Sequence, residues 1–245
     1  MEMDTQEVAL IVGAGPGLGF SLARRFARAE MSVAIAARHA EKLETLAAGC
    51  SGITHQCRAY ACDATDGGDV ERLFNQVSAE LGEPNLVVYN AGAFLRKGIL
   101  DTTAAEFEHC WRVGCMGGFV VGQAAARTML ARVERGGVGG TLIFTGATAS
   151  LRGSALFVNL AVGKFGLRAL AQSMARELQP RGIHVVHVVI DGEIRSTAAM
   201  EQGAKEAMDS RLDPDAIAET YYQLHRQHRS AWSLEVDLRP WVEKF

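Results

Sequence analysis

The sequence has 245 residues, of which 48% are hydrophobic and 22% are charged, and its net charge is −3. This composition is typical of a folded globular chain and argues against extended disorder. The small negative charge and the lack of a basic stripe argue against nucleic acid as a partner. No apolar run is long enough to span a bilayer, which argues against a transmembrane protein.

The first residues, MEMDTQEVALIVG, are acidic and lead straight into a strand pattern, without the charged and apolar regions of a signal peptide. We therefore expect a cytoplasmic protein. Its cysteines are odd in number and show no CxxC spacing, so reduced and mostly buried thiols are expected rather than disulfides or zinc ligands. They are Cys50, Cys57, Cys62, Cys110 and Cys115.

Short apolar runs alternate with longer helical patterns along the whole chain. The runs predicted as strands are residues 7–13, 31–37, 55–62, 85–90, 140–146, 183–190 and 233–238. The segments predicted as helices are residues 20–30, 40–49, 68–82, 105–113 with 125–133, the stretch around Lys164, and 214–227. Near-continuous apolar strands alternating with helices predict an α/β fold with a single doubly wound Rossmann-type parallel sheet of about seven strands and helices on both faces. No repeat or Pro/Ser-rich linker interrupts it, so residues 1–245 are expected to form one domain.

A glycine-rich turn, VGAGPGLG, follows the first predicted strand and opens the first predicted helix. Glycines at this point let the backbone turn sharply and approach a pyrophosphate, whose charge then lies at the helix N-terminus. The strand–turn–helix context is the condition that makes such a motif informative. The turn therefore predicts a dinucleotide site, with the candidate residues Gly13, Gly15, Gly17, Leu18 and Gly19.

The spacing of Gly13, Gly17 and Gly19 is GxxxGxG rather than GxGxxG. Together with later motifs, this form resembles the short-chain dehydrogenase/reductase superfamily over nearly the whole chain. The later motifs are Cys62-Asp63-Ala64-Thr65 after the third strand and Asn90-Ala91-Gly92 after the fourth. The resemblance implies that Asp63 and Ala64 contact the adenine and that Asn90, Ala91 and Gly92 lie behind the cofactor.

Arg38 follows the second predicted strand, where an acidic residue would bind a ribose 2′-hydroxyl. An arginine there can pair with a 2′-phosphate instead, which favours NADP(H) over NAD(H). A solvated surface arginine without a ligand is the other interpretation.

The family usually carries a catalytic Tyr, a Lys four residues later, a Ser about a dozen residues before the Tyr, and an Asn on an earlier helix. Lys164 matches the lysine, and its implied role is to hold the nicotinamide ribose. The other positions are occupied by Leu160, Ala147 and Gly114, which have no proton to give. The chain is in this respect similar to a divergent, mostly bacterial subgroup that keeps the Lys and carries an apolar residue in place of the Tyr.

A shift of one position would put Thr148 or Asn159 in the empty places, although Asn159 would be rotated about 100° from Leu160 on a helix. Thr145 and Thr148 are the better sources of a hydroxyl. Family members have a Pro-Gly turn after the sixth strand, where this chain has Asp191 and Gly192. The resemblance implies that the Ile194 backbone and Ser196 meet the nicotinamide carboxamide. Asp191 and Glu193 are either acids near a substrate or ordinary turn carboxylates.

The family's substrate lid corresponds to residues 195–230, where Tyr221 or Tyr222 could act as a surrogate acid. His184 and His187 should point to opposite faces of a strand, and His225 and His228 lack a third ligand, so no metal site is expected. Cys115 is either a reactive thiol near the cleft or, more in keeping with its type, a buried one.

The apolar final strand and the two long helices are the surfaces through which family members pair, so a homodimer or homotetramer is expected. Two functions stay open. One is an NAD(P)(H)-dependent oxidoreductase on an unidentified carbonyl or alcohol substrate, without the usual catalytic residues. The other is a non-catalytic pseudoenzyme that binds the cofactor as a scaffold or redox sensor.

Overall fold

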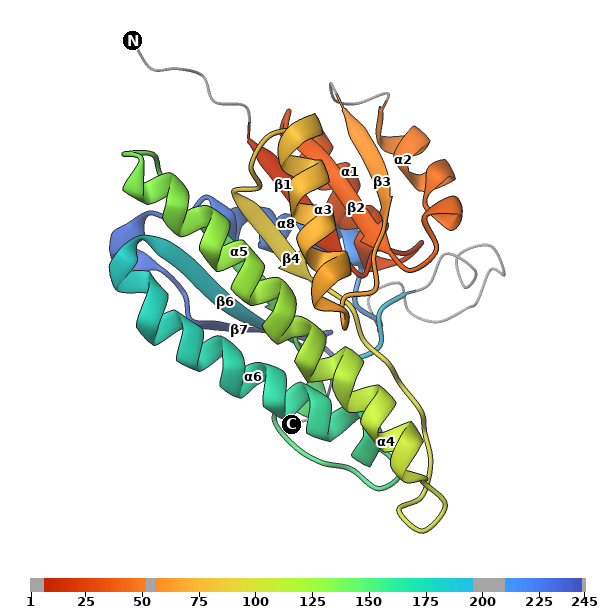
Figure 1. Cartoon of the computed structure of the whole chain (residues 1–245). Coiled ribbons are helices and arrows are strands. Elements are labelled where there is room, and N and C mark those ends of the chain that lie inside the picture. Colours follow the sequence, from red (N-terminus) through yellow and green to blue (C-terminus); the bar gives the residue numbers. More distant parts are fainter. Residues whose placement is uncertain (1–6, 52–55, 196–209, 244–245) are drawn as a thin grey trace.

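The computed structural model describes residues 7–51, 56–195 and 210–243. Seven parallel strands form one sheet in the order β3-β2-β1-β4-β5-β6-β7 (Figure 1). The strands are β1 (Val8–Val12), β2 (Ser32–Ala37), β3 (Cys57–Ala61), β4 (Leu86–Tyr89), β5 (Gly140–Thr145), β6 (Ile183–Ile190) and β7 (Glu235–Leu238). The strand order reverses between β1 and β4, and a doubly wound sheet binds its ligands at such a point.

The apolar runs form the strands that the sequence predicts. Every residue of β1 and of β6 is buried, as expected of strands covered on both faces by helices. The two edge strands differ from these, because β3 and β7 each contain exposed and partly covered residues. The prediction of a seven-stranded parallel Rossmann-type sheet is confirmed.

Helices connect the strands and cover both faces of the sheet. The α-helices are α1 (Leu18–Arg28), α2 (Glu44–Ser51), α3 (Gly67–Glu80), α4 (Ala104–Trp111), α5 (Gly117–Glu134), α6 (Val158–Leu178) and α8 (Pro214–His225). A π-helix, η2 (Arg112–Met116), joins α4 to α5. Short 3-10 helices are η1 (Ala40–Lys42), η3 (Thr148–Ser150), η4 (Gln179–Arg181) and η5 (Arg229–Ala231).

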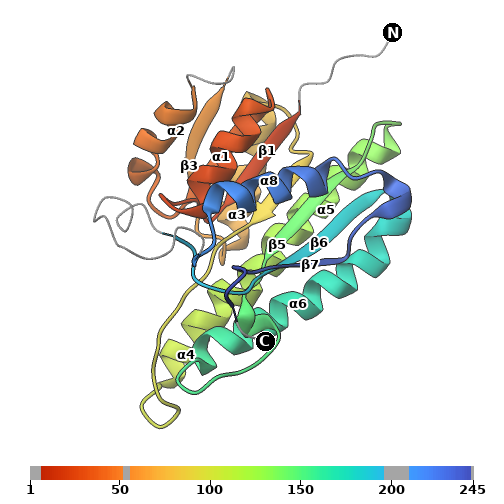
Figure 2. The same cartoon turned by 180° about the vertical axis from the view of Figure 1, so that it is seen from behind.

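Two apolar clusters lie on opposite faces of the sheet. Helices α3, α5 and α6 pack on one face, and α1, α2 and α8 pack on the other (Figures 1 and 2). The alternation of side chains along β6 divides its residues between these clusters, with Val185 in one and Val186 in the other. The core thus consists of two layers that hold the strand ends, and the loops after them, in fixed positions.

Helix α8, which lies within the predicted lid, has one side packed in the core. Its residues Ile217, Ala218, Tyr221 and Leu224 are buried, and it packs against α1. Arg25 of α1 both pairs with Glu219 and lies over the ring of Tyr222. An amphipathic helix buries its apolar side wherever a complementary face is available. The lid of residues 195–230 stays a prediction, and its helical part is packed on α1. Residues 196–209 lie outside the described part of the chain.

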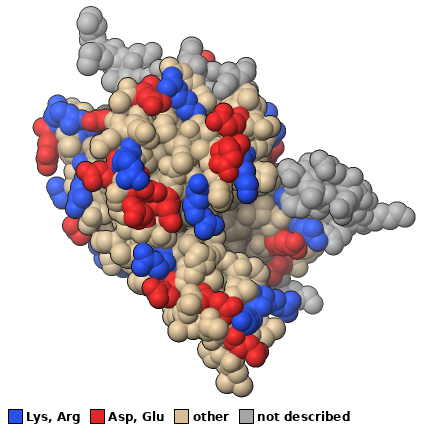
Figure 3. Space-filling model, turned by 45° about the vertical axis from the view of Figure 1, so that its right-hand side comes forward, with Lys and Arg blue, Asp and Glu red and all other residues tan. Residues whose placement is uncertain are grey.

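Among the described residues, no helix combines the length and apolarity that a membrane span requires. Acidic and basic side chains are interspersed over the face in Figure 3, without a large patch of one sign on that face.

Candidate functional site

The glycine turn after β1 is held against the turn after β4. Gly13 has φ +90°, which a side chain disfavours, and a Cβ on it would lie 2.3 Å from the Ala91 nitrogen. The Asn90 side chain donates a hydrogen bond to the Gly13 oxygen at 2.9 Å. Gly13 is thus required for the contact between two turns that the sequence analysis assigned to one site.

Gly15 and Gly17 differ from Gly13 because a Cβ on either would meet nothing within 4 Å. Gly17 is the N-cap of α1, and no side chain caps that helix or places an acid in its first turn. Uncapped N–H groups and an open, side-chain-free turn fit a pyrophosphate. Gly19, by contrast, lies against Ala14, where a Cβ would be 2.8 Å from the Ala14 Cα. Leu18 is buried at the start of the helix.

The ends of β2 and β3 bring Arg38 and Asp63 to the same edge of the sheet. Arg38 is exposed. Hydrogen bonds from the Thr65 N–H and hydroxyl hold the pKa of the Asp63 carboxyl below its ordinary value, and the nearby Arg38 charge adds to this effect. Ala64 is buried in the core beside them. The turn is therefore held by its own hydrogen bonds, and Arg38 presents a positive charge beside it.

Lys164 lies in α6 with its side chain buried, only 6% exposed. Its ammonium donates to the Thr145 carbonyl oxygen at 2.7 Å, and a Cβ on Gly92 would lie 3.8 Å from the Lys164 Nζ. Burial lowers the pKa of Lys164 to about 8. An ammonium has three donors, so this group is placed between β5 and the turn after β4 with capacity to bind further acceptors.

The three positions that lack a proton donor differ in their surroundings. Leu160 lies one turn before Lys164 on α6 and is partly exposed, and Ala147 follows β5 in extended backbone. Gly114 lies in the π-helix, where a Cβ would be 3.1 Å from the Gly163 Cα of α6. The two helices therefore cross in close contact at the position where the resemblance would place an asparagine side chain.

Other groups considered as substitutes are occupied elsewhere. The Asn159 amide donates to the Leu95 oxygen and to the Thr102 hydroxyl, each at 3.3 Å, so it holds the loop before α4. The buried Tyr221 hydroxyl donates to the Thr145 hydroxyl at 3.0 Å, which occupies both groups in the core. Tyr221 is therefore not a surrogate acid.

Thr148 and Asp191 are brought together, although they are 43 residues apart. The Thr148 hydroxyl donates to Asp191 Oδ1 at 2.6 Å. Arg239, after β7, lies 3.2 Å from Asp191 Oδ2. Sequence reasoning identified Thr148 and Asp191 separately but not as a pair. The signal that could have found it is the register of β5 and β6, which leave the sheet at the same edge.

The turn after β6 carries the remaining candidates. Gly192 has φ +148°, and a Cβ on it would lie 2.8 Å from the Pro240 ring. Ile194 forms a parallel bridge with Leu212 in which Glu193 and Arg195 make the hydrogen bonds. In this pattern the N–H and C=O of Ile194 point away from Leu212. Ser196 lies outside the described residues.

Comparisons with known proteins agree with this geometry. The short chain dehydrogenase family matches residues 7–207. This chain belongs to the short-chain dehydrogenase/reductase family. Members of this family are NAD(P)-dependent oxidoreductases. A short-chain dehydrogenase/reductase of Armillaria gallica is 35% identical over 181 residues, which cover 73% of this chain and 67% of the relative.

Solved structures give the same result for this dehydrogenase-family chain. A short-chain dehydrogenase from Rhodopseudomonas palustris is 36% identical, covers 96% of this chain and 99% of its own, and has a TM-score of 0.81. A metagenomic short-chain oxidoreductase in complex with NADP is 23% identical with a TM-score of 0.81, over 96% of this chain and 97% of its own. That second likeness concerns the fold.

Two histidines of this short-chain dehydrogenase contact other side chains, and one thiol is affected by burial. His184 stacks on Trp232 from one face of β6, while His187 contacts Glu235 at 2.9 Å. Burial raises the pKa of the Cys115 thiol, which argues against a reactive thiolate. Within residues 7–51, 56–195 and 210–243, no three His, Cys, Asp or Glu side chains form a cluster that could hold a metal ion.

Proposed function

We propose that this chain is an NADP(H)-preferring oxidoreductase that acts on an alcohol or carbonyl compound without a catalytic tyrosine. Gly13, Gly15, Gly17 and the α1 N-terminus would hold the pyrophosphate, Arg38 the 2′-phosphate, and Lys164 the nicotinamide ribose. The bound dinucleotide would supply hydride transfer. The residues of this chain would bind and orient it.

The observation that carries the proposal is the buried ammonium of Lys164. A buried charge without an anionic partner is costly, and the Thr145 carbonyl is the acceptor to which Lys164 donates in this structure. Hydroxyls of a ribose would supply further acceptors. A lysine that served only the fold could be replaced by an apolar side chain of similar length, so its retention in an apolar helix supports a ligand-binding role.

A non-catalytic cofactor-binding protein, acting as a scaffold or redox sensor, is the second candidate. It is favoured by Leu160, Ala147 and Gly114, because a positioned acid/base contributes about 10²–10⁴ in rate and an oxyanion donor about 10²–10³. Such losses overlap rather than add. Without these groups, ordinary carbonyl reduction would still be strongly impaired.

Titration with NADPH and NADH tests the binding step. Quenching of the three tryptophans and energy transfer to the nicotinamide report on binding. Micromolar binding of NADPH with weaker binding of NADH is expected. If neither binds up to millimolar concentration, the proposed function fails. A panel of alcohols and ketones then separates the two candidates, since only the oxidoreductase changes the nicotinamide absorbance.

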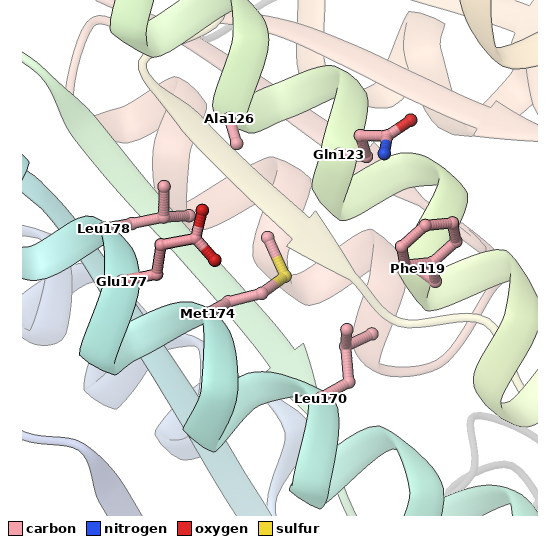
Figure 4. A pocket seen from close by; sticks show the side chains of 7 residues that line it. All are labelled: Phe119, Gln123, Ala126, Leu170, Met174, Glu177 and Leu178. Atoms are coloured by element: carbon pink, nitrogen blue, oxygen red, sulfur yellow. The ribbon is translucent and has the colours of Figure 1, made fainter.

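We further propose that the outer face of α5 and α6 pairs two subunits. Phe119 and Phe165 are about two-fifths exposed on these helices. A pocket of about 160 Å³ lies between α5 and α6. Figure 4 shows the side chains that line it, Phe119, Gln123 and Ala126 from α5 and Leu170, Met174, Glu177 and Leu178 from α6. Exposed aromatic side chains beside an apolar hollow are typical of an interface. Sedimentation of Phe119→Glu should give a smaller species than the wild type.

A further inference from the structure

A hydroxyl–carboxylate pair lies at the carboxyl edge of the sheet. Neither member occupies the position of the family's catalytic Tyr, Ser or Asn. Thr148 opens η3 directly after Ala147, and Asp191 follows the last residue of β6. The Thr148 Oγ1 and Asp191 Oδ1 atoms are 2.6 Å apart. Thr148 is partly exposed, whereas the Asp191 side chain is 8% exposed. Thr148 is therefore the more accessible member of the pair.

The Asp191 carboxylate pairs with an arginine from the segment after β7. Arg239 follows β7, and its guanidinium lies 3.2 Å from Asp191 Oδ2. Pro240, the next residue, packs against Gly192. The C-terminal segment thus covers the turn after β6 and places a positive charge against the carboxylate.

This arrangement fixes the direction of the hydrogen bond. An ionised carboxylate only accepts, so the single proton of the Thr148 hydroxyl is directed at Asp191. The lone pairs of the Thr148 oxygen stay available. A ligand that meets this oxygen must therefore offer a donor, and a ketone or aldehyde oxygen cannot do so.

We propose that Thr148 and Asp191 bind the hydroxyl group of an alcohol substrate, with Thr148 accepting its hydrogen bond and Asp191 fixing that polarity. This inference rests on the proposed function, because it concerns the substrate of that dinucleotide site. The pair lies beside Ala147, and η3 packs against α6, the helix of Leu160 and Lys164. When the alcohol is oxidised, its carbon-bound hydrogen would leave as hydride to the oxidised dinucleotide of the proposed site. Its hydroxyl proton would pass to Thr148 Oγ1 while the Thr148 proton passes to Asp191 Oδ1.

The other polar groups near this edge do not offer the same chemistry. The Thr145 hydroxyl accepts from Tyr221 in the core. The Glu193 side chain is 71% exposed and pairs with Arg211. A carboxylate in that setting is solvated, so it does not hold a neighbouring hydroxyl in one orientation.

The test measures binding rather than turnover. Protein saturated with NADPH is examined by saturation-transfer NMR with three matched pairs of probes: cyclohexanol and cyclohexanone, 1-indanol and 1-indanone, and 2-octanol and 2-octanone. We expect at least one alcohol to bind about tenfold more tightly than its ketone, as follows from leaving a polar group of the site unpaired. If no alcohol binds better than its ketone while NADPH binds, the inference is overturned and the proposed function stands. If NADPH does not bind, the proposed function itself fails.

Variants show whether Thr148 and Asp191 bind the alcohol or only stabilise the turn after β6. Thr148→Val keeps the shape and removes the lone pairs, so the alcohol preference should be lost, and Thr148→Ser should restore it. Asp191→Asn lets the amide donate to Thr148 and frees the hydroxyl proton, so the preference should move toward the ketone. Glu193→Gln is the matched carboxylate control and should change nothing. An unchanged alcohol-to-ketone ratio in Thr148→Val, with NADPH affinity intact, would show that the pair only stabilises the turn.

Discussion

Two glycine-containing regions of this molecule, the turn after β1 and the crossing of η2 with α6, differ in what the missing side chains allow. In the turn after β1, Gly13 allows close contact with Ala91, while Gly15 and Gly17 leave space that no protein atom fills. At the crossing of η2 and α6, Gly114 and Gly163 leave no such space, because each would place a Cβ within about 3.2 Å of the other's Cα. In the first region the missing side chains leave room that a ligand could occupy. In the second they allow two helices to pack closely.

The difference separates two parts of the proposed site. The part built on β1 to β3, where we propose that the dinucleotide binds, combines the open turn with an exposed cation at Arg38. The part built on β4 to β6 has a close helix contact at Gly114 and a polar pair, Thr148 and Asp191. An open turn leaves room for a ligand, whereas two helices in contact leave no room for a side chain between them.

Changing Gly13 should give the largest effect on stability. Gly13→Ala places a side chain at φ +90° and against the Ala91 backbone, which we expect to cost about 3–5 kcal/mol in free energy of unfolding. Urea unfolding followed by tryptophan fluorescence measures it.

Gly15→Ala is the matched variant for that measurement. Because its Cβ meets no protein atom, the free energy of unfolding should change by less than about 1 kcal/mol. NADPH affinity should nevertheless fall by about tenfold, since the methyl group enters the space of the ligand. If both substitutions lowered the free energy of unfolding equally, the distinction between Gly13, which is in contact with Ala91, and Gly15, which faces open space, would be contradicted.

Lys164→Met should separate binding from stability. Burial lowers the pKa of Lys164 from 10.5 to about 8, so the folded protein bears the cost of a buried charge at neutral pH. Removing that charge should raise the free energy of unfolding at pH 7 by about 1–3 kcal/mol while it weakens NADPH binding. Lys97→Met is the control, because Lys97 pairs with Glu106 nearer the surface and its loss should stabilise nothing.

The difference in free energy of unfolding between Lys164→Met and the wild type should depend on pH in one direction. Between pH 8 and pH 10.5 the unfolded chain keeps the Lys164 proton and the folded chain releases it, so wild-type stability gains with rising pH. The stability advantage of Lys164→Met is therefore full below pH 8 and shrinks above it. Thermal unfolding of both proteins at pH 6.5, 8 and 9.5 checks this, and a constant difference would refute the buried-charge argument.

The sequence predicted the sheet and the positions of the glycine turn because both depend on local patterns. Continuous apolar strands and the GxxxGxG spacing are properties of neighbouring residues. The packing of α8 on α1 was not predicted, because an amphipathic pattern does not reveal which face will cover it. The Thr148–Asp191 pair and the contact of Gly114 with Gly163 depend on residues more than 40 positions apart. Such contacts are decided by strand register and helix crossing, which no local pattern contains.

Gly114→Asn tests whether the closed position can be refilled. An asparagine side chain there would begin 3.1 Å from the Gly163 Cα, so we expect a loss of about 1–3 kcal/mol in free energy of unfolding and no gain of carbonyl reduction. Gly67→Asn is the control, since a Cβ at Gly67 meets nothing within 4 Å. Activity restored by Gly114→Asn without loss of stability would mean that the helices can separate and that the site has lost only one side chain.

Arg38→Ala should have the smallest effect, confined to the choice of dinucleotide. An exposed guanidinium that pairs with a 2′-phosphate contributes about 1–2 kcal/mol, so NADPH affinity should fall by about tenfold and NADH affinity should stay unchanged. The difference should narrow in high salt, because exposed charges are screened. Arg28→Ala removes an equally exposed charge at the far end of α1 and should alter neither affinity. If Arg38→Ala weakens both dinucleotides alike, Arg38 orders the rim of the site without reading the phosphate, and the preference for NADPH must come from another residue.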